Sequence, residues 1–126
     1  MRLAPHHVGI IVSDLARSKE FYGALGFEFV DERVGEDKTL TFMRLGGLQV
    51  ELFAYREPVP APDATHEKVL GFRHLAFETP DIDGVFSELR ERGIIGGDIA
   101  IRELPGGWRL LFFPDPDGME IEIKQA

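Results

Sequence analysis

Four polar residues at matching places in the chain have the types and spacing needed for chemistry. His7 and His74 each lie at the start of a short run that is rich in apolar residues, and Glu51 and Glu122 each lie near the middle of a later run. Strand alternation places His7 on the same side as the small Gly9, which leaves room beside the imidazole. Two neutral imidazoles and two carboxylates form a mixed N/O donor set that suits Zn, Ni, Co, Mn or Fe(II).

The chemistry of this donor set is that of a catalytic metal rather than a structural one. Four protein ligands leave positions open on an ion that takes five or six, and open positions indicate catalysis. Such an ion polarises a substrate oxygen and stabilises an enediolate, while a neighbouring carboxylate removes a proton. The chain has no cysteine, which excludes thiolate metal sites, iron–sulfur clusters, cysteine nucleophiles and a disulfide framework.

Other polar residues lack the support of a matching partner. His6, His66 and Glu120 are interpreted as surface residues or as residues that support the ligands. Arg73 and Arg109 could bind a substrate carboxylate, but an arginine at a strand edge is more often a surface residue.

An internal repeat explains why the four candidates come in two pairs. A shift of 67 residues, the separation of His7 and His74, aligns the same elements in the same order. The shift also aligns Asp14 with Asp81, Leu15 with Ile82, Gly26 with Gly93, and Phe27 with Ile94. If the two copies pair about a pseudo-twofold axis, the two histidines and two glutamates can converge on one ion.

Each copy is predicted to form a βαβββ module. In both, an apolar strand is followed by an aspartate that can cap a helix, an amphipathic segment, a glycine that can end it, and three runs of period two. The predicted strands are 7–12, 27–33, 38–45 and 48–55 in the first copy and 73–78, 98–103, 108–113 and 119–124 in the second. We therefore expect an α+β fold in which two tandem modules form a partly open, curved mixed sheet around a metal-centred cavity. The 126 residues form a single domain, with module 1 at 1–55, a proline-containing linker at 56–70 and module 2 at 71–126.

Charge and hydropathy limit the classes of partner that the chain is expected to bind. The chain has 14 Lys and Arg against 22 Asp and Glu, a formal net charge of −8, so its surface repels phosphate backbones and anionic lipids. No run of apolar residues has the length of a membrane span, and the N-terminal residues do not resemble a signal peptide. We expect a cytoplasmic protein that binds a small molecule and neither nucleic acid nor a membrane.

The sequence resembles the vicinal-oxygen-chelate superfamily over nearly its whole length. That superfamily includes glyoxalase I, fosfomycin-resistance proteins, bleomycin-resistance proteins, extradiol dioxygenases and methylmalonyl-CoA epimerase. The chain is most similar to small bacterial glyoxalase-like, or lactoylglutathione lyase-like, proteins. The resemblance rests on His7-Val8-Gly9-Ile10, Asp14-Leu15, Phe21-Tyr22-Gly23-Ala24-Leu25-Gly26-Phe27, Val50-Glu51-Leu52-Phe53, Arg73-His74-Leu75-Ala76-Phe77, Asp115-Pro116-Asp117-Gly118 and Ile121-Glu122.

The resemblance implies roles for the candidates. It implies a divalent metal on His7, His74 and Glu122, with Glu51 as the additional glutamate of glyoxalase-like members. It implies a lyase or isomerase acting on the hemithioacetal of a 2-oxoaldehyde and a thiol, with Glu122 as the base and Glu51 as the second carboxylate. The segment 56–70 shows no feature that would recognise glutathione. A homodimer is expected, with the four ligands supplied by one chain or by two.

Two alternatives stay open at this point. One is a non-catalytic protein that binds a drug or metabolite in the same cavity, lined by aromatic residues such as Phe53 and Trp108. The other is an Fe(II) extradiol-type dioxygenase in which Glu51 does not bind the metal.

Overall fold

The computed structural model of the chain describes residues 1–61 and 68–126, which fall into two compact units, Met1–Ala61 and Pro62–Ala126. The boundary between the units falls within the predicted linker 56–70. His66, which we interpreted as a surface or supporting residue, lies outside the described residues.

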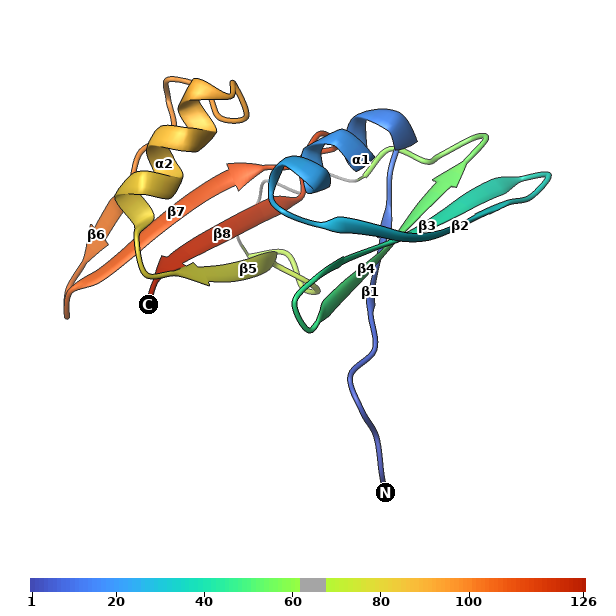
Figure 1. The fold of residues 1–126 in the computed structure, drawn as a ribbon, viewed down its shortest axis with the longest axis horizontal. Coiled ribbons are helices and arrows are strands. Elements are labelled where there is room, and N and C mark those ends of the chain that lie inside the picture. The colour runs from blue at the N-terminus through green and yellow to red at the C-terminus, as the bar shows by residue number, and fades with distance from the viewer. Residues whose placement is uncertain (62–67) are drawn as a thin grey trace. The chain divides into compact units, whose positions relative to one another are not determined.

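Unit 1 has the predicted strand–helix–three-strand order (Figure 1). Its elements are β1 (Val8–Ile11), α1 (Leu15–Ala24), β2 (Glu28–Val34), β3 (Lys38–Leu45) and β4 (Leu48–Tyr55). The strands form one mixed sheet in the order β1-β4-β3-β2, with β1 parallel to β4 and the other pairs antiparallel. The Gly46–Gly47 turn joins β3 to β4 as predicted, with Gly46 at a φ of 56°.

Unit 2 repeats this architecture. Its elements are β5 (His74–Thr79), α2 (Ile82–Glu91), β6 (Arg102–Leu104), β7 (Trp108–Pro114) and β8 (Glu120–Gln125). The sheet order is β5-β8-β7-β6, with β5 parallel to β8 and the other pairs antiparallel. The prediction of two tandem βαβββ modules with an α+β fold is therefore confirmed.

The predicted capping residues begin and end both helices. The carboxylates of Asp14 and Asp81 accept hydrogen bonds from backbone N–H groups three residues further on, at 3.1 and 2.9 Å. Beyond the C-terminal ends of the helices, Gly26 and Gly93 have φ angles of 102° and 69°. A residue with a side chain adopts such positive φ angles only at a cost in free energy. Because these four residues come in repeat-related pairs, both helices are positioned in the same way.

Each helix covers one face of its own sheet and leaves the other face open. In unit 1, Ile10 and Val12 are buried on the α1 side, whereas Gly9 and Ile11 are exposed on the opposite side. In unit 2, α2 packs on β7 and β8. Each sheet therefore has a helix-covered face and a face free of helices, called here the open face, and the open face carries the candidate ligands.

One strand differs from its prediction. β6 covers only Arg102–Leu104, whereas the prediction was 98–103. The backbone N–H of Ile99 donates to the carbonyl of Gly96, which closes a turn, so the chain joins the sheet only at Arg102. In the described part of the chain, neither ten-residue helix is long and apolar enough to cross a membrane.

Candidate metal centre

In unit 1 the predicted ligands His7 and Glu51 contact each other. His7 directly precedes β1, and Glu51 lies in β4, where it pairs with Gly9 of the parallel strand. The His7 Nε2 atom lies 2.9 Å from Glu51 Oε2. Glu51 is buried, with 8% relative exposure, and the His7 imidazole gives its carboxylate a polar partner.

Unit 2 contains the same contact between His74 and Glu122. His74 begins β5, and Glu122 lies in β8, where it pairs with Ala76 of the parallel strand. The His74 Nε2 atom lies 2.7 Å from Glu122 Oε2, and the side-chain exposure is 14% for Glu122 and 30% for His74.

A phenylalanine lies beside each histidine–glutamate pair. The sequence favoured Phe112 as a core or pocket-wall residue but did not place it at the ligands, and it gave no indication of Phe42. Phe42 pairs with Glu51 across β3 and β4, and its ring meets the His7 ring edge-on at 5.4 Å between centroids. Phe112 pairs with Glu122 across β7 and β8, and its ring lies 5.8 Å from that of His74. The repeat combined with hairpin register could have indicated them, because each phenylalanine lies directly opposite its glutamate.

The second ring nitrogen of each histidine also has a polar neighbour. His7 Nδ1 lies 2.7 Å from Nδ1 of His6, and His74 Nδ1 lies 3.6 Å from Oε1 of Glu120. The same Glu120 oxygen lies 3.5 Å from Nη2 of Arg73. A metal-binding histidine usually donates its other ring N–H to a carboxylate, a backbone carbonyl or water, and that hydrogen bond fixes the tautomer and the ring orientation. Glu120 is a carboxylate beside His74 but lies beyond the distance of a direct hydrogen bond, and the neighbour of His7 is a second imidazole.

The donor pairs fit a divalent ion. Two ligands held at right angles around an ion at about 2.1 Å lie about 3 Å apart, close to the N–O separations of 2.9 and 2.7 Å. An imidazole nitrogen and a carboxylate oxygen are ligands that Zn²⁺, Mn²⁺, Ni²⁺ and Fe²⁺ accept. Within residues 1–61 and 68–126 no group of three or more His, Cys, Asp or Glu side chains is arranged so that it could hold a metal ion, and each unit contributes two of the four predicted ligands.

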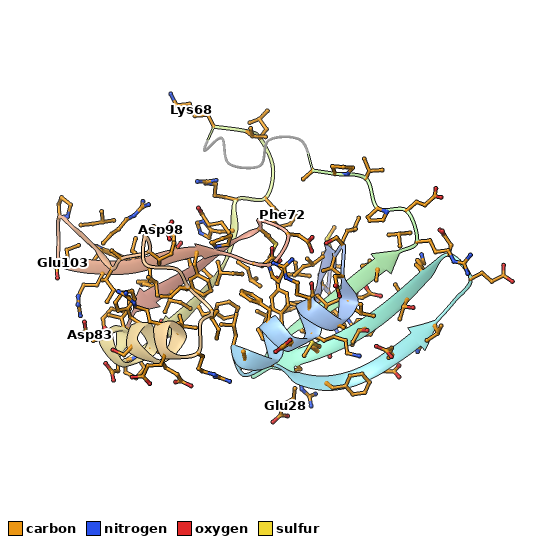
Figure 2. The ribbon with its side chains drawn as sticks, turned by 90° about the horizontal axis from the view of Figure 1, so that it is seen from above. Glu28, Lys68, Phe72, Asp83, Asp98 and Glu103 are labelled. Atoms are coloured by element: carbon orange, nitrogen blue, oxygen red, sulfur yellow. The ribbon has the colours of Figure 1, made fainter. Side chains whose placement is uncertain are left out.

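Arg109 lies away from the candidate ligands. It projects from β7 on the α2 side of the sheet and donates to both carboxylate oxygens of Asp83, at 2.7 and 2.8 Å, with Glu103 Oε1 3.5 Å from its Nε atom. Figure 2 labels Asp83, in α2, and Glu103, in β6. The hydrogen bonds from Arg109 lower the pKa of the Asp83 carboxyl, and those to Asp83 raise the pKa of the guanidinium. This ion pair joins α2 to β7, on the face of the sheet opposite the His74–Glu122 pair.

A model of the Glyoxalase/Bleomycin resistance protein/Dioxygenase superfamily matches residues 4–123. The chain is 37% identical over 124 residues to the uncharacterized protein YwkD of Bacillus subtilis, which covers 95% of this chain and 94% of that one. It is 32% identical to a glyoxalase family protein from Enterococcus faecalis, with a TM-score of 0.79 over 96% of each chain.

A more distant structure shares the fold alone. The fosfomycin resistance protein FosX of Listeria monocytogenes, solved with Mn(II) and a sulfate ion, is 17% identical, with a TM-score of 0.72 over 100% of this chain and 94% of that chain. Taken with the repeated modules and the family match over nearly all residues, these comparisons establish that the chain belongs to the glyoxalase/bleomycin resistance protein/dioxygenase superfamily.

Proposed function

We propose that the chain is a metal-dependent lyase or isomerase of glyoxalase type. It acts by proton transfer on a small oxygenated substrate that chelates the metal, such as the hemithioacetal of a 2-oxoaldehyde and a thiol. The metal ligands are His7, Glu51, His74 and Glu122. The observation that carries the proposal is that both units build the same imidazole–carboxylate pair at the same sheet position.

The two pairs support a shared ion because each alone is an incomplete site. One nitrogen and one oxygen are too few to hold a divalent ion tightly, whereas two such pairs supply four ligands and leave open positions for a substrate. A homodimer is part of the proposal, with the pairs supplied by one chain or by two. A mixture of His7→Ala and His74→Ala chains tells these arrangements apart, because only ligands from two chains regenerate an intact site in the mixed dimer.

When bound, a divalent ion supplies polarisation of the substrate oxygens, which makes the adjacent C–H more acidic. The Glu122 carboxylate takes the proton from one carbon and returns it to the neighbouring carbon, while the hydroxyl proton moves from the first carbon's oxygen to the neighbouring carbon's oxygen, so the hemithioacetal becomes a 2-hydroxy thioester. Glu51 is the second carboxylate of the site. Phe42 and Phe112 pack against the histidines and shield the carboxylates from water, which strengthens their electrostatic interactions.

The proposal is tested by metal content and activity measured on the same preparations. Protein purified without chelator or affinity metal is expected to contain a divalent metal by elemental analysis. His74→Ala is expected to lower that content, while Glu88→Gln, which removes a carboxylate on the exposed side of α2, leaves it unchanged. Equal metal content in His74→Ala and the parent chain contradicts the ligand assignment.

Activity is measured with hemithioacetals formed from one 2-oxoaldehyde and several thiols. Replacing Glu122 with Gln keeps the shape of the side chain but removes the base, so kcat is expected to fall about 10²- to 10⁴-fold. Full activity of Glu122→Gln, or full activity after the metal has been removed, contradicts the proposal.

A non-catalytic binding protein is the second candidate. Aromatic side chains on the open faces favour it: Phe53 stacks on Tyr55, and Trp108 is about half exposed. Purified protein that binds small aromatic molecules but contains no metal and turns over no hemithioacetal would favour this candidate over the enzyme.

A further inference from the structure

The open face of unit 2, which carries the predicted ligands His74 and Glu122, also carries two cations that lie over aromatic rings. The Lys124 ammonium lies 4.4 Å from the centroid of the Trp108 ring, and the Arg102 guanidinium lies 5.4 Å from that of Phe112. Strand alternation places Lys124 on the same face as Glu122, two residues further along β8.

Neither cation is neutralised by a carboxylate within the described ranges. The chain has an excess of acidic residues, and cations on the helix side of its sheets, such as Arg109 and Lys19, form ion pairs at 2.7 to 2.9 Å. Glu78 is the register partner of Lys124 on β5, yet no ion pair forms between them, and the ammonium lies over Trp108 instead. An aromatic ring attracts a cation without cancelling its charge, so Lys124 and Arg102 keep their charges available for an anion.

The two cations lie at different distances from the predicted base. Arg102 lies over Phe112, which pairs with Glu122, whereas the Lys124 ammonium lies over Trp108, further along β7. The backbone of Lys124 itself is two residues, about 7 Å, from that of Glu122. Phe112 connects Arg102 to the predicted ligands, because it pairs with Glu122, contacts the His74 ring and lies under Arg102.

We propose that Lys124 and Arg102 form an anion subsite that binds a carboxylate or phosphate group of the substrate, next to an apolar part that lies against Trp108. The assignment of this anion to the substrate rests on the proposed function, and it adds a substrate class: small acids rather than neutral compounds. Lys124 and Arg102 are specificity residues, since the proton is moved by Glu122.

Unit 1 provides a matched control for the cation–aromatic contact. Lys38 lies 5.8 Å from the ring centroid of Phe53 and 5.5 Å from that of Tyr55. It pairs with Tyr55, four residues beyond Glu51 on β4, which is about 13 Å along the strand. Replacing Lys38 removes the same charge from a similar cation–aromatic contact in unit 1, away from the Lys124–Trp108 contact of unit 2.

Trp108 makes the test direct, because it is the only tryptophan in the chain. Its fluorescence is titrated with benzoate, phenyl phosphate and neutral benzyl alcohol at constant ionic strength, and calorimetry measures the same affinities independently of the tryptophan. At least one of the two anions is expected to bind at least tenfold more tightly than benzyl alcohol, and the stronger of the two identifies the group.

Variants then assign the binding to the subsite. Lys124→Met and Arg102→Met are each expected to weaken anion binding at least fivefold, Lys124→Arg to retain it, and Glu78→Gln to strengthen it by removing a nearby negative charge. Lys38→Met is expected to bind anions as the parent chain does. Equal weakening in Lys38→Met and Lys124→Met, or equal binding of benzoate, phenyl phosphate and benzyl alcohol, overturns the subsite.

Metal binding is measured in the same variants, so that a failure of the anion subsite can be told apart from a failure of the proposed function. Lys124→Met is expected to keep the metal affinity of the parent chain. A chain that binds metal but shows no preference for anions contradicts the subsite alone. A chain that prefers anions but binds no metal contradicts the proposed function and leaves an anion-binding protein.

Discussion

Glu51 and Glu122 occupy the same position in their two sheets. Glu51 lies between Gly9 on the parallel strand and Phe42 on the antiparallel one, and Glu122 lies between Ala76 and Phe112. In each unit one carboxylate oxygen lies 2.9 or 2.7 Å from Nε2 of the histidine at the beginning of the neighbouring parallel strand. The internal repeat therefore reproduces not only the order of elements but also the environment of a single carboxylate.

The Glu120 carboxylate, 3.6 Å from His74 Nδ1, predicts a graded effect on metal affinity. Glu120→Ala removes the carboxylate beside His74 Nδ1, so the ring loses an orienting partner and metal affinity is expected to fall about 10- to 100-fold. Glu120→Gln keeps an oxygen that can accept from Nδ1 and is expected to lose less. Titration calorimetry with one divalent metal checks both variants. Loss of affinity to the same extent in the exposed-residue control Glu103→Ala would show that overall charge, and not this contact, sets the affinity.

Much of the fold follows from local signals that both modules repeat. The aspartates and glycines that begin and end the helices have local roles, so Asp14 and Gly26 could be recognised without tertiary information. The face of each first strand was predictable in the same way, because alternation separates His7 and Gly9 from the apolar side of β1. These signals require only the neighbouring residues along the chain.

What could not be predicted depends on register between strands. That Phe112 lies opposite Glu122 follows from where the β7–β8 turn begins and ends, and that Arg109 reaches Asp83 follows from the packing of α2 on the sheet. The start of β6 was misplaced for a similar reason: Ile99 and Ile101 continue an alternating pattern, but the turn closed by Gly96 and Ile99 holds the chain off the sheet. An alternating pattern of apolar and polar residues predicts an extended segment but does not show which strand it pairs with.

Removal of the metal is expected to lower the stability of the chain. A ligand that binds only the folded protein stabilises it by about 2.7 kcal/mol at a free concentration of 100 times its Kd. The parent chain should therefore melt at a lower temperature after dialysis against a chelator and recover when Zn²⁺ or Mn²⁺ is added back. The double variant His7→Ala/His74→Ala should melt at the same temperature in both conditions. A metal-dependent shift of the same size in that variant would place the metal elsewhere.

The ion pair between Asp83 and Arg109 is expected to contribute to stability in a defined pH range. Hydrogen bonds from Arg109 lower the pKa of Asp83 in the folded state. A carboxyl whose pKa is lower folded than unfolded stabilises the fold above its unfolded pKa of about 3.9, and that contribution is lost as the pH falls through the folded pKa. Asp83→Asn should therefore be less stable than the parent chain at neutral pH and equal to it in strong acid. Urea unfolding at several pH values measures the difference.

The control for this prediction is on the same helix. Glu88 pairs with Arg92 at the exposed surface, four residues further along the chain, and such pairs contribute little. Glu88→Gln should show a smaller change in unfolding free energy than Asp83→Asn at neutral pH. A difference between Asp83→Asn and the parent chain that grows as the pH falls would contradict the assigned direction of the pKa shift.

Ser18 is expected to be a site where a substitution increases stability. It is fully buried in α1, and among the described residues its hydroxyl oxygen has no hydrogen-bond partner. The repeat aligns Ser18 with Val85 of α2, where unit 2 has an apolar side chain in place of the hydroxyl. A buried hydroxyl without a partner carries a desolvation cost, and alanine has a higher helix propensity than serine, so Ser18→Ala should raise the unfolding free energy by about 1 kcal/mol.

The control is Ser87→Ala on the exposed side of α2, which changes helix propensity alone and should raise the unfolding free energy less. A destabilised Ser18→Ala would mean that the hydroxyl has a polar partner in solution, such as a bound water, and the melting temperatures of the two variants decide between these outcomes.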